Sequence, residues 1–297
     1  LGAGRFGFDF TPFILTGTDS RFLTNAPTTQ YANLEDYGTI SFLTTLTNVN
    51  RIFLVYKDSA GSPVGQEYVY LSTANGASTS ISTSNDALVY FGCFPANLRN
   101  WSTTFNALIT GGNIQGGSIE VTARFQTTDM SKTYKIQLNC PNTKGYESIR
   151  LCWLNQWGAW DYYTFTKKSV KSINTNGSTY QQLGGTWNES LYRIDSYKGG
   201  KKAFRVNSTE SILMNTGFVL ESENVMFEEL INSPEVYELK GFGDDPSSGA
   251  FNSALNTYVT PVRLKTSSFT RKTSSNDRLL QYTFEIEKSK TLRTQSV

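Results

Sequence analysis

Carboxylates are the side chains of this sequence that could do chemistry, because the chain contains no histidine. Histidine is the usual general base, the commonest transition-metal ligand and the group that activates a serine or cysteine nucleophile. Two carboxylates alone can still hydrolyse a glycosidic bond. The candidates Asp161, Glu228, Asp244 and Asp245 are scattered along the chain or lie in expected loops. We therefore predict that the protein is not an enzyme and has no catalytic residue.

Two glycine-rich segments match ligand-binding loops in part of their pattern only. Gly2–Gly7 fits G-x-G-x-x-G, but a dinucleotide-binding loop follows a strand and opens a helix, whereas alternating phenylalanines follow here. Gly241–Gly249 contains Asp244 and Asp245, yet it lacks the alternating carboxylates and the terminal glutamate of a calcium loop. We predict a strand entry at the first segment and an exposed turn at the second, with no cofactor and no metal.

The cysteines and the charge balance also point away from common binding sites. Cys93, Cys140 and Cys152 cannot all pair within one chain and lack CxxC spacing, so we expect reduced, half-buried thiols. The net charge of +2, from 27 basic and 25 acidic residues, is too balanced for a surface that neutralises phosphates. No run approaches the roughly 18 apolar residues of a membrane helix. We expect neither a direct nucleic-acid partner nor membrane insertion.

Composition and local patterns predict an all-β fold that is mainly antiparallel. Aromatic residues reach 13% and charged residues only 18%, which favours strands and turns over helices. Phe6, Phe8 and Phe10 alternate as in a half-buried strand. Arg51–Lys57 and Gln66–Ser72 flank a turn-rich segment and predict a β-hairpin. A chain of 297 residues is long enough for two such domains, each resembling a sandwich or a barrel.

Polar turn residues at 139–145 mark the expected domain boundary. We predict an N-terminal β-domain at residues 1–139 and a C-terminal β-domain at 140–297. The C-terminal domain opens with the strongly aromatic segment Ile149–Phe165, whose strand-forming residues lie on both sides of Gly158. This arrangement predicts a hairpin with its tip near Gly158.

One short helix and a closing hairpin complete the expected C-terminal domain. The helix should run from Ser222 to Asn232, because Ser222 can cap its first turn and Pro234 prevents its continuation. Apolar residues alternate with polar ones from 280 to 287, and 262–269 is the expected partner strand.

The aromatic hairpin admits two interpretations. Its rings could form an exposed platform that stacks on sugars, or they could anchor a domain core or a subunit interface. We favour the second, since strand alternation buries half of the rings in any case. The expected interface residues come from the aromatic and closing hairpins: Trp153, Trp157, Trp160, Tyr162, Phe165, Tyr282 and Phe284. The nearby Lys167, Lys168 and Lys171 should be a solvated strand end rather than a phosphate site.

Three motifs in roughly residues 148–290 resemble tail-region structural proteins of tailed bacteriophages. Trp153–Phe165 is similar to their "LN-x-x-G-x-W-D-x-x-x-F" hairpin, and Phe227–Tyr237 is similar to their short helix followed by an "SPEVY" strand. Residues 261–287 resemble their closing hairpin. The first 140 residues show no comparable likeness.

The resemblance implies a structural virion protein that assembles in the tail, tail hub or baseplate. Its expected partners are other virion proteins, and further copies of itself in an oligomer or ring, through edge strands and extended arms. The family has no catalytic residues to transfer to this chain. The alternative function is a carbohydrate- or host-receptor-binding β-module of the virion, which would leave tryptophans exposed in a shallow groove.

Overall fold

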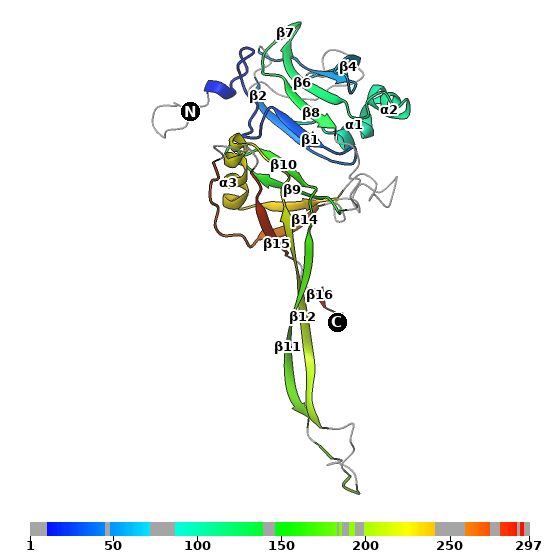
Figure 1. The fold of residues 1–297 in the computed structure, drawn as a ribbon, viewed down its shortest axis with the longest axis vertical. Helices are drawn as coiled ribbons and strands as arrows, with labels where there is room; N and C mark the ends of the chain where they lie inside the picture. The colour runs from blue at the N-terminus through cyan, green and yellow to red at the C-terminus, as the bar shows by residue number, and fades with distance from the viewer. Residues whose placement is uncertain are drawn as a thin grey trace.

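The structure is a computed structural model that describes residues 11–44, 48–71, 87–138, 146–182, 184–185, 190–193, 199–240, 259–273, 280–289 and 292–293. Figure 1 shows two stacked β-rich bodies, the first blue to green and the second green to red, with a long two-stranded ribbon that leaves the second body. The fold is all-β with short helices, as the sequence predicts.

The N-terminal body has a six-stranded sheet in the order β1-β8-β6-β3-β4, with β7 beside β6, and a separate pair β2-β5. All pairs are antiparallel except β1 and β8, which run parallel. The strands are β1 (Thr29–Ala32), β2 (Thr39–Thr44), β3 (Arg51–Lys57), β4 (Pro63–Tyr70), β5 (Ala87–Gly92), β6 (Ser118–Phe125), β7 (Thr128–Asp129) and β8 (Tyr134–Leu138). The expected hairpin of β3 and β4 is confirmed.

The β2-β5 pair packs against the larger sheet around one core. Phe42 of β2 and Phe91 of β5 are buried in the same apolar cluster as Leu54 of β3 and Ile136 of β8. The two layers therefore pack face to face, as in a sandwich.

Three helical elements in the N-terminal body were not expected: the 3-10 helix η1 (Thr11–Phe13) and the α-helices α1 (Pro95–Trp101) and α2 (Thr103–Thr110). The expectation of a single short helix is therefore wrong. Pro95 begins α1, where its missing N–H costs nothing, and the Ser102 hydroxyl caps α2 by accepting the Phe105 N–H at 2.9 Å. Both helices are too short to show a clear helical period in the sequence.

The C-terminal body is one sheet of eight strands in the order β10-β9-β13-β14-β15-β12-β11, with β16 beside β12. The strands are β9 (Ile149–Leu154), β10 (Trp160–Phe165), β11 (Val170–Gln182), β12 (Gly200–Asn215), β13 (Val236–Leu239), β14 (Val259–Leu264), β15 (Thr283–Lys288) and β16 (Leu292–Arg293). The β9-β10 hairpin turns at Gly158, whose φ of 75° suits a glycine, and β14 pairs with β15. Both hairpins expected from the sequence are confirmed.

This sheet curls around its core instead of facing a second sheet. Phe165 on β10 lies 5.9 Å, between ring centres, from Phe284 on β15, although three strands separate them in the sheet. Helix α3 (Asn224–Asn232), preceded by the 3-10 turn η3 (Glu221–Glu223), contributes Phe227 to the same core. The helix that the sequence predicts from Ser222 to Asn232 is therefore confirmed.

The predicted domain boundary falls between two apolar clusters. The larger N-terminal cluster ends at Leu138, and the C-terminal cluster begins at Ile149 apart from Ala26. The boundary residues 139–145 lie outside the described part of the chain, as do the expected strand at Phe6–Phe10 and both glycine-rich segments.

Candidate functional site: a protruding two-stranded arm

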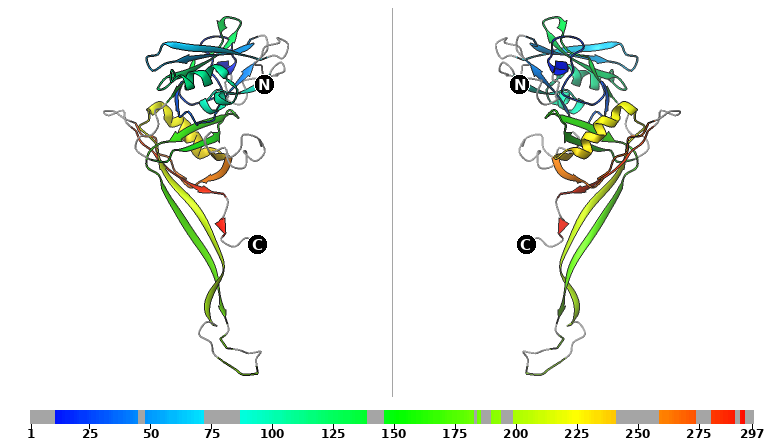
Figure 2. Two further views of the ribbon diagram at one scale, coloured as in Figure 1. Left: turned by 90° about the vertical axis from the view of Figure 1, so that its right-hand side faces the viewer. Right: turned by 90° about the vertical axis from the view of Figure 1, so that its left-hand side faces the viewer.

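The long ribbon, here called the arm, consists of β11 and β12. The two strands pair antiparallel from Val170↔Leu213 near the body to Gln182↔Gly200 at the far end, with one bulge after Ser178. Figures 1 and 2 show that the arm projects far beyond the rest of the C-terminal body. The sequence did not reveal it, because Ser, Thr, Asn and Gly dominate β11 and hide any apolar alternation.

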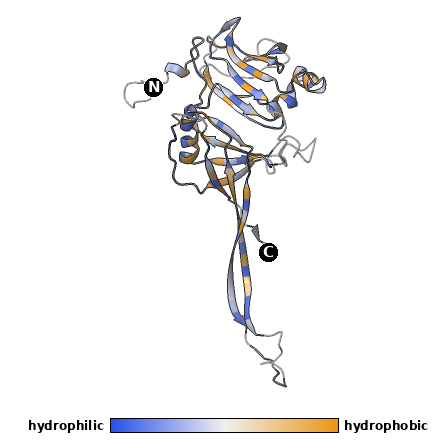
Figure 3. Ribbon diagram, in the orientation of Figure 1, coloured by the Kyte–Doolittle hydropathy of each residue, from blue (hydrophilic) through white to orange (hydrophobic). Residues whose placement is uncertain are grey.

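The arm exposes apolar side chains that it cannot bury by itself. Ile173 is 66% exposed and Phe204 60% exposed, and Tyr180 and Val206 are exposed as well. Figure 3 shows apolar positions continuing from the body along the arm. An isolated two-stranded ribbon is at best marginally stable in water, and the described part of the chain leaves these apolar side chains uncovered.

One face of the arm continues the apolar face of the sheet. Ile212 on β12 is buried in the C-terminal core and lies opposite Lys171. Ile173 lies on the same face, because side chains two positions apart on a strand share a face, and Val206 joins it through its pairing with Gly177. Ile173 and Val206 therefore lie on the core-facing side of the ribbon, interspersed with polar residues such as Glu210 and Thr175, past the point where the protein's own core ends.

Both outer edges of the arm lack a strand partner for much of their length in the described residues. β11 is the last strand of the sheet, so its outward backbone groups have no ladder. β12 pairs with β15 from Ser211 to Asn215 and with β16 only at Asn207 and Ser208. No described strand pairs with the outer side of β12 at residues 200–206. Unpaired edges of this kind are templates for pairing with another chain.

Charge differs between the two strands of the arm. β11 has a single charged residue, Lys171, which lies near the body and forms a 2.6 Å ion pair with Glu147. The hydrogen bond of this pair lowers the pKa of Glu147 and raises the pKa of Lys171. The part of β12 that lies farthest from the body, residues 200–205, has three basic residues and no acidic one: Lys201, Lys202 and Arg205.

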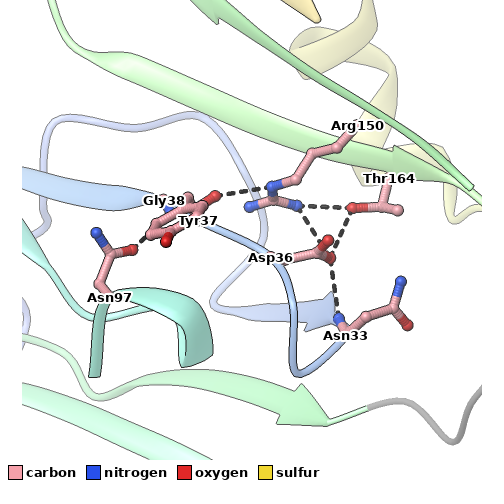
Figure 4. A network of polar contacts seen from close by, with 7 residues as sticks. All are labelled: Asn33, Asp36, Tyr37, Gly38, Asn97, Arg150 and Thr164. Atoms are coloured by element: carbon pink, nitrogen blue, oxygen red, sulfur yellow. Dashed lines mark hydrogen bonds and ion pairs between the residues drawn. The ribbon is translucent and has the colours of Figure 1, made fainter. Parts of the chain in front are cut away.

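A buried polar network fixes the body that holds the arm. Arg150 of β9 donates from Nε to the carbonyl oxygen of Tyr37 at 2.8 Å and from Nη1 to Thr164 Oγ1 at 2.7 Å. Thr164 donates to Asp36 Oδ2 at 2.9 Å, and the Arg150 guanidinium lies 3.5 Å from the same carboxylate (Figure 4). Asp36 and Tyr37 belong to the N-terminal body, so the network locks the two bodies together.

A second buried carboxylate joins the two bodies nearby. Asp161 of β10 accepts hydrogen bonds from the Thr24 hydroxyl and, at 3.0 Å, from the Asn155 side chain. Asn155 also donates to the carbonyl oxygen of Leu23 at 3.0 Å. Burial raises the pKa of Asp161 to about 6, against the hydrogen bonds, which lower it.

The structure places four of the seven expected interface residues inside the C-terminal core. All four side chains are buried: Trp153, Phe165, Tyr282 and Phe284. A fully enclosed ring cannot touch another subunit, so these residues stabilise the fold instead of forming an interface.

The other three expected interface residues are half-buried and contact neighbouring parts of the same chain. Trp157 packs on Phe13 with ring centres 4.4 Å apart, and Trp160 packs on Tyr237 at 5.8 Å. The Tyr162 hydroxyl lies 2.9 Å from Thr39 Oγ1 of the N-terminal body. The rings of this hairpin are thus used within the chain. Exposed apolar side chains lie on the arm and also on the bodies, where Phe218 is 67% exposed and Tyr31 62% exposed.

The groups considered for sugar chemistry are not assembled into a site among the described residues. No tryptophan described by the structure belongs to the exposed apolar residues. Asp161 is buried, and Glu228 forms an ion pair with Arg271 beside an open hollow of about 530 Å³ next to α3. Asp244 and Asp245 lie outside the described residues.

The structure describes only part of the residues that bear on the cysteines, a metal site or a membrane helix. Cys93 and Cys152 are free and buried, and Cys140 lies outside the described residues. The described chain contains no cluster of His, Cys, Asp and Glu that could hold a metal ion. None of its described helices is long and apolar enough to cross a membrane.

Comparison with known proteins adds no relative. No family model matches the chain, and neither the curated proteins nor the solved structures contain a match.

Proposed function

We propose that this chain is a non-enzymatic assembly subunit that binds other protein subunits through its arm. The observation that carries the proposal is the set of exposed apolar side chains on an otherwise unsupported ribbon, with Ile173 and Phe204 the most exposed. A ribbon of this length loses conformational entropy on ordering and gains little burial within one chain. Contact with a partner would supply the missing burial.

The polar network between the two bodies supports the same function. A long arm can position a partner only if the sheet that holds it is fixed. Arg150 ties β9, which belongs to the same sheet as the arm, to the N-terminal body through Asp36 and Tyr37. The motif resemblance of residues 148–290 extends the proposal to the particle: a structural virion protein in the tail, tail hub or baseplate of a tailed bacteriophage, with other virion proteins as partners.

Shortening the arm tests the proposal. Replacing residues 175–208 by an Asn-Gly turn joins Asn174 to Thr209, which are paired in the ribbon. We expect the shortened chain to keep its fold, measured by near-UV circular dichroism, and to be missing from particles purified after complementation. The matched control is Ile14→Ser, which removes an exposed apolar side chain from the N-terminal body. Normal incorporation of the shortened chain, or absence of the unaltered chain from particles, would overturn the proposal.

A receptor- or carbohydrate-binding module remains the second candidate, because the far half of the arm carries an exposed aromatic pair. Tyr180 and Phe204 stand edge to face with ring centres 6.3 Å apart. Aromatic faces of this kind stack on sugars. Binding of the purified chain to a glycan array, lost in the double variant Tyr180→Ala with Phe204→Ala, would favour this function over assembly.

A further inference from the structure

A short segment of the N-terminal body, residues 23–26, lies against the C-terminal body between Asp161 of β10 and Glu229 of α3. This segment is here called the latch. We propose that the latch stays closed on the C-terminal body while both carboxyl groups carry protons, and opens when both are ionised. The inference goes beyond the proposed function, because it concerns the junction of the two bodies and not the arm.

Two consecutive latch residues are held by the two carboxyl groups. The Thr24 hydroxyl donates to Asp161 Oδ1, and the Asn25 side chain donates to Glu229 Oε1 at 2.7 Å. Asn155 in the β9-β10 turn supports the first contact by donating to Asp161 Oδ2 at 3.0 Å. Every described hydrogen bond between the latch and the C-terminal body involves one of these three C-terminal side chains, so the contact depends on the state of the two carboxyl groups.

The two ends of the latch are held differently. Leu23 donates its N–H to the carbonyl oxygen of Ser41 at 2.8 Å, which ties the start of the latch to the N-terminal body. Ala26 at the other end is buried in the apolar cluster of the C-terminal body. Because an alanine side chain buries little apolar surface, weakening the polar contacts should suffice to withdraw this end of the latch.

Neither latch carboxyl forms an ion pair in the described part of the chain. On the side of the N-terminal body, the charge of Asp161 acts on Tyr134, whose hydroxyl is hydrogen-bonded to Arg21. On the side of α3, the neighbouring carboxylate of Glu228 already pairs with Arg271. Ionisation of both latch carboxyls would therefore place two negative charges around the same segment with no cation bound to either.

The surroundings of the two carboxyl groups favour their neutral forms in the closed latch. Burial raises the pKa of Asp161 to about 6 and that of Glu229 to about 7, and the charge of Asp161 adds to the shift at Glu229. Glu229 Oε2 is enclosed and has no hydrogen-bond partner among the described residues, which costs less for a neutral group than for a charged one. The closed latch thus holds protons more tightly than the open latch, so closure is favoured at low pH and is lost as the pH rises through 6 to 7.

Amide hydrogen exchange of the complete chain at pH 6 and pH 8 tests the inference. The informative amides are those of Asn25, which donates to Asp161, and of Ala26, which donates to Thr24 Oγ1 at 2.9 Å. Protection factors remove the intrinsic effect of pH on exchange. We expect the protection of these two amides to fall by about tenfold between the two pH values, while that of the core strand β3 stays the same.

Three variants identify the responsible groups. Glu229→Gln, at a half-buried position beside the open hollow, should reduce the fall to about twofold, which is the share left to Asp161. Adding Asp161→Asn should abolish the pH dependence, because neither side chain then titrates. Glu228→Gln is the matched control on the same helix and should keep the tenfold fall, because Arg271 lowers the pKa of Glu228 and keeps this group ionised throughout the range.

Three results would overturn the inference. Unchanged protection of Asn25 and Ala26 in the unaltered chain would mean that the carboxyl groups do not control the latch. An equal fall in β3 would mean that the whole protein is destabilised and that no local opening takes place. A full tenfold fall in folded Glu229→Gln would assign the pH dependence to another group.

Discussion

Arg150 and Asp36 form a buried ion pair that joins the two bodies of the protein. The two side chains are only 5% and 8% exposed, and 3.5 Å separates Nη1 from Oδ2. The guanidinium also lies 4.8 Å above the ring of Phe94. A charge in such a place is tolerated because its partners are supplied from both bodies, so it makes the contact between them specific.

Removing Arg150 should therefore be costly. We expect Arg150→Ala to lower the free energy of unfolding by about 3–5 kcal/mol, because it leaves the Asp36 carboxylate buried without its cationic partner. Urea denaturation measures the loss. The control is Arg263→Ala, since Arg263 is 71% exposed in its 3.3 Å ion pair with Glu287 and should contribute less than about 1 kcal/mol. Similar losses in both variants would refute the prediction.

The buried carboxylate of Asp161 should make stability depend on pH. Burial raises its pKa in the folded protein to about 6, above the ordinary value of 3.8, so the folded state holds the proton more tightly. The contribution is complete below pH 4 and is lost as the pH rises towards 6, a change on the order of 3 kcal/mol.

Denaturation midpoints between pH 4 and 6 measure this dependence. We expect Asp161→Asn to flatten the curve in that window, although the variant is less stable overall because an amide cannot accept all the hydrogen bonds of the carboxylate. Glu285→Gln is the control of opposite sign, since Lys265 lowers the pKa of Glu285 and its contribution is lost as the pH falls. An unchanged slope in Asp161→Asn would contradict the assignment.

The aromatic residues of the closing strand should behave as core residues. Phe284 is buried between Phe165 and Phe227. We expect Phe284→Ala to cost about 3–5 kcal/mol of unfolding free energy through the lost burial and the cavity left behind. Phe218→Ala, at a ring 67% exposed, should change it by less than about 0.5 kcal/mol. Chemical denaturation of both variants measures the two free energies of unfolding. A small effect at Phe284 would contradict the assignment of its ring to the core.

Two glycines should respond differently to the same substitution. A Cβ on Gly117 would overlap the carbonyl oxygen of Lys57, whereas a Cβ on Gly17 would meet no atom within 4 Å. We expect Gly117→Ala to lower the free energy of unfolding by about 1–3 kcal/mol, because the backbone carbonyl of Lys57 in the β3-β6 ladder cannot move aside without disturbing the strand pairing. Gly17→Ala should be neutral or slightly stabilising. Calorimetry of the pair tests this, and equal melting temperatures would show that the ladder adjusts.

Local sequence determined much of the secondary structure. Strands β10 and β15 follow from alternating apolar side chains, the β9-β10 turn from Gly158, and helix α3 from its apolar stripe and the proline that follows it. These signals lie within a few residues of one another, so they need no knowledge of the rest of the fold. Helices α1 and α2 could not be predicted because each spans only about two turns, too few to show a helical period.

The tertiary structure alone decided what each apolar face touches. Alternation showed that one side of the aromatic hairpin is buried, but it could not tell a core from an interface, and Trp153 and Phe165 lie in the core. Arg150 and Asp36 meet across 114 residues of sequence, and no local pattern encodes such a pair. The arm likewise depends on β11 and β12 pairing where neither strand has strong apolar alternation, because backbone hydrogen bonding between strands leaves little trace in side-chain type.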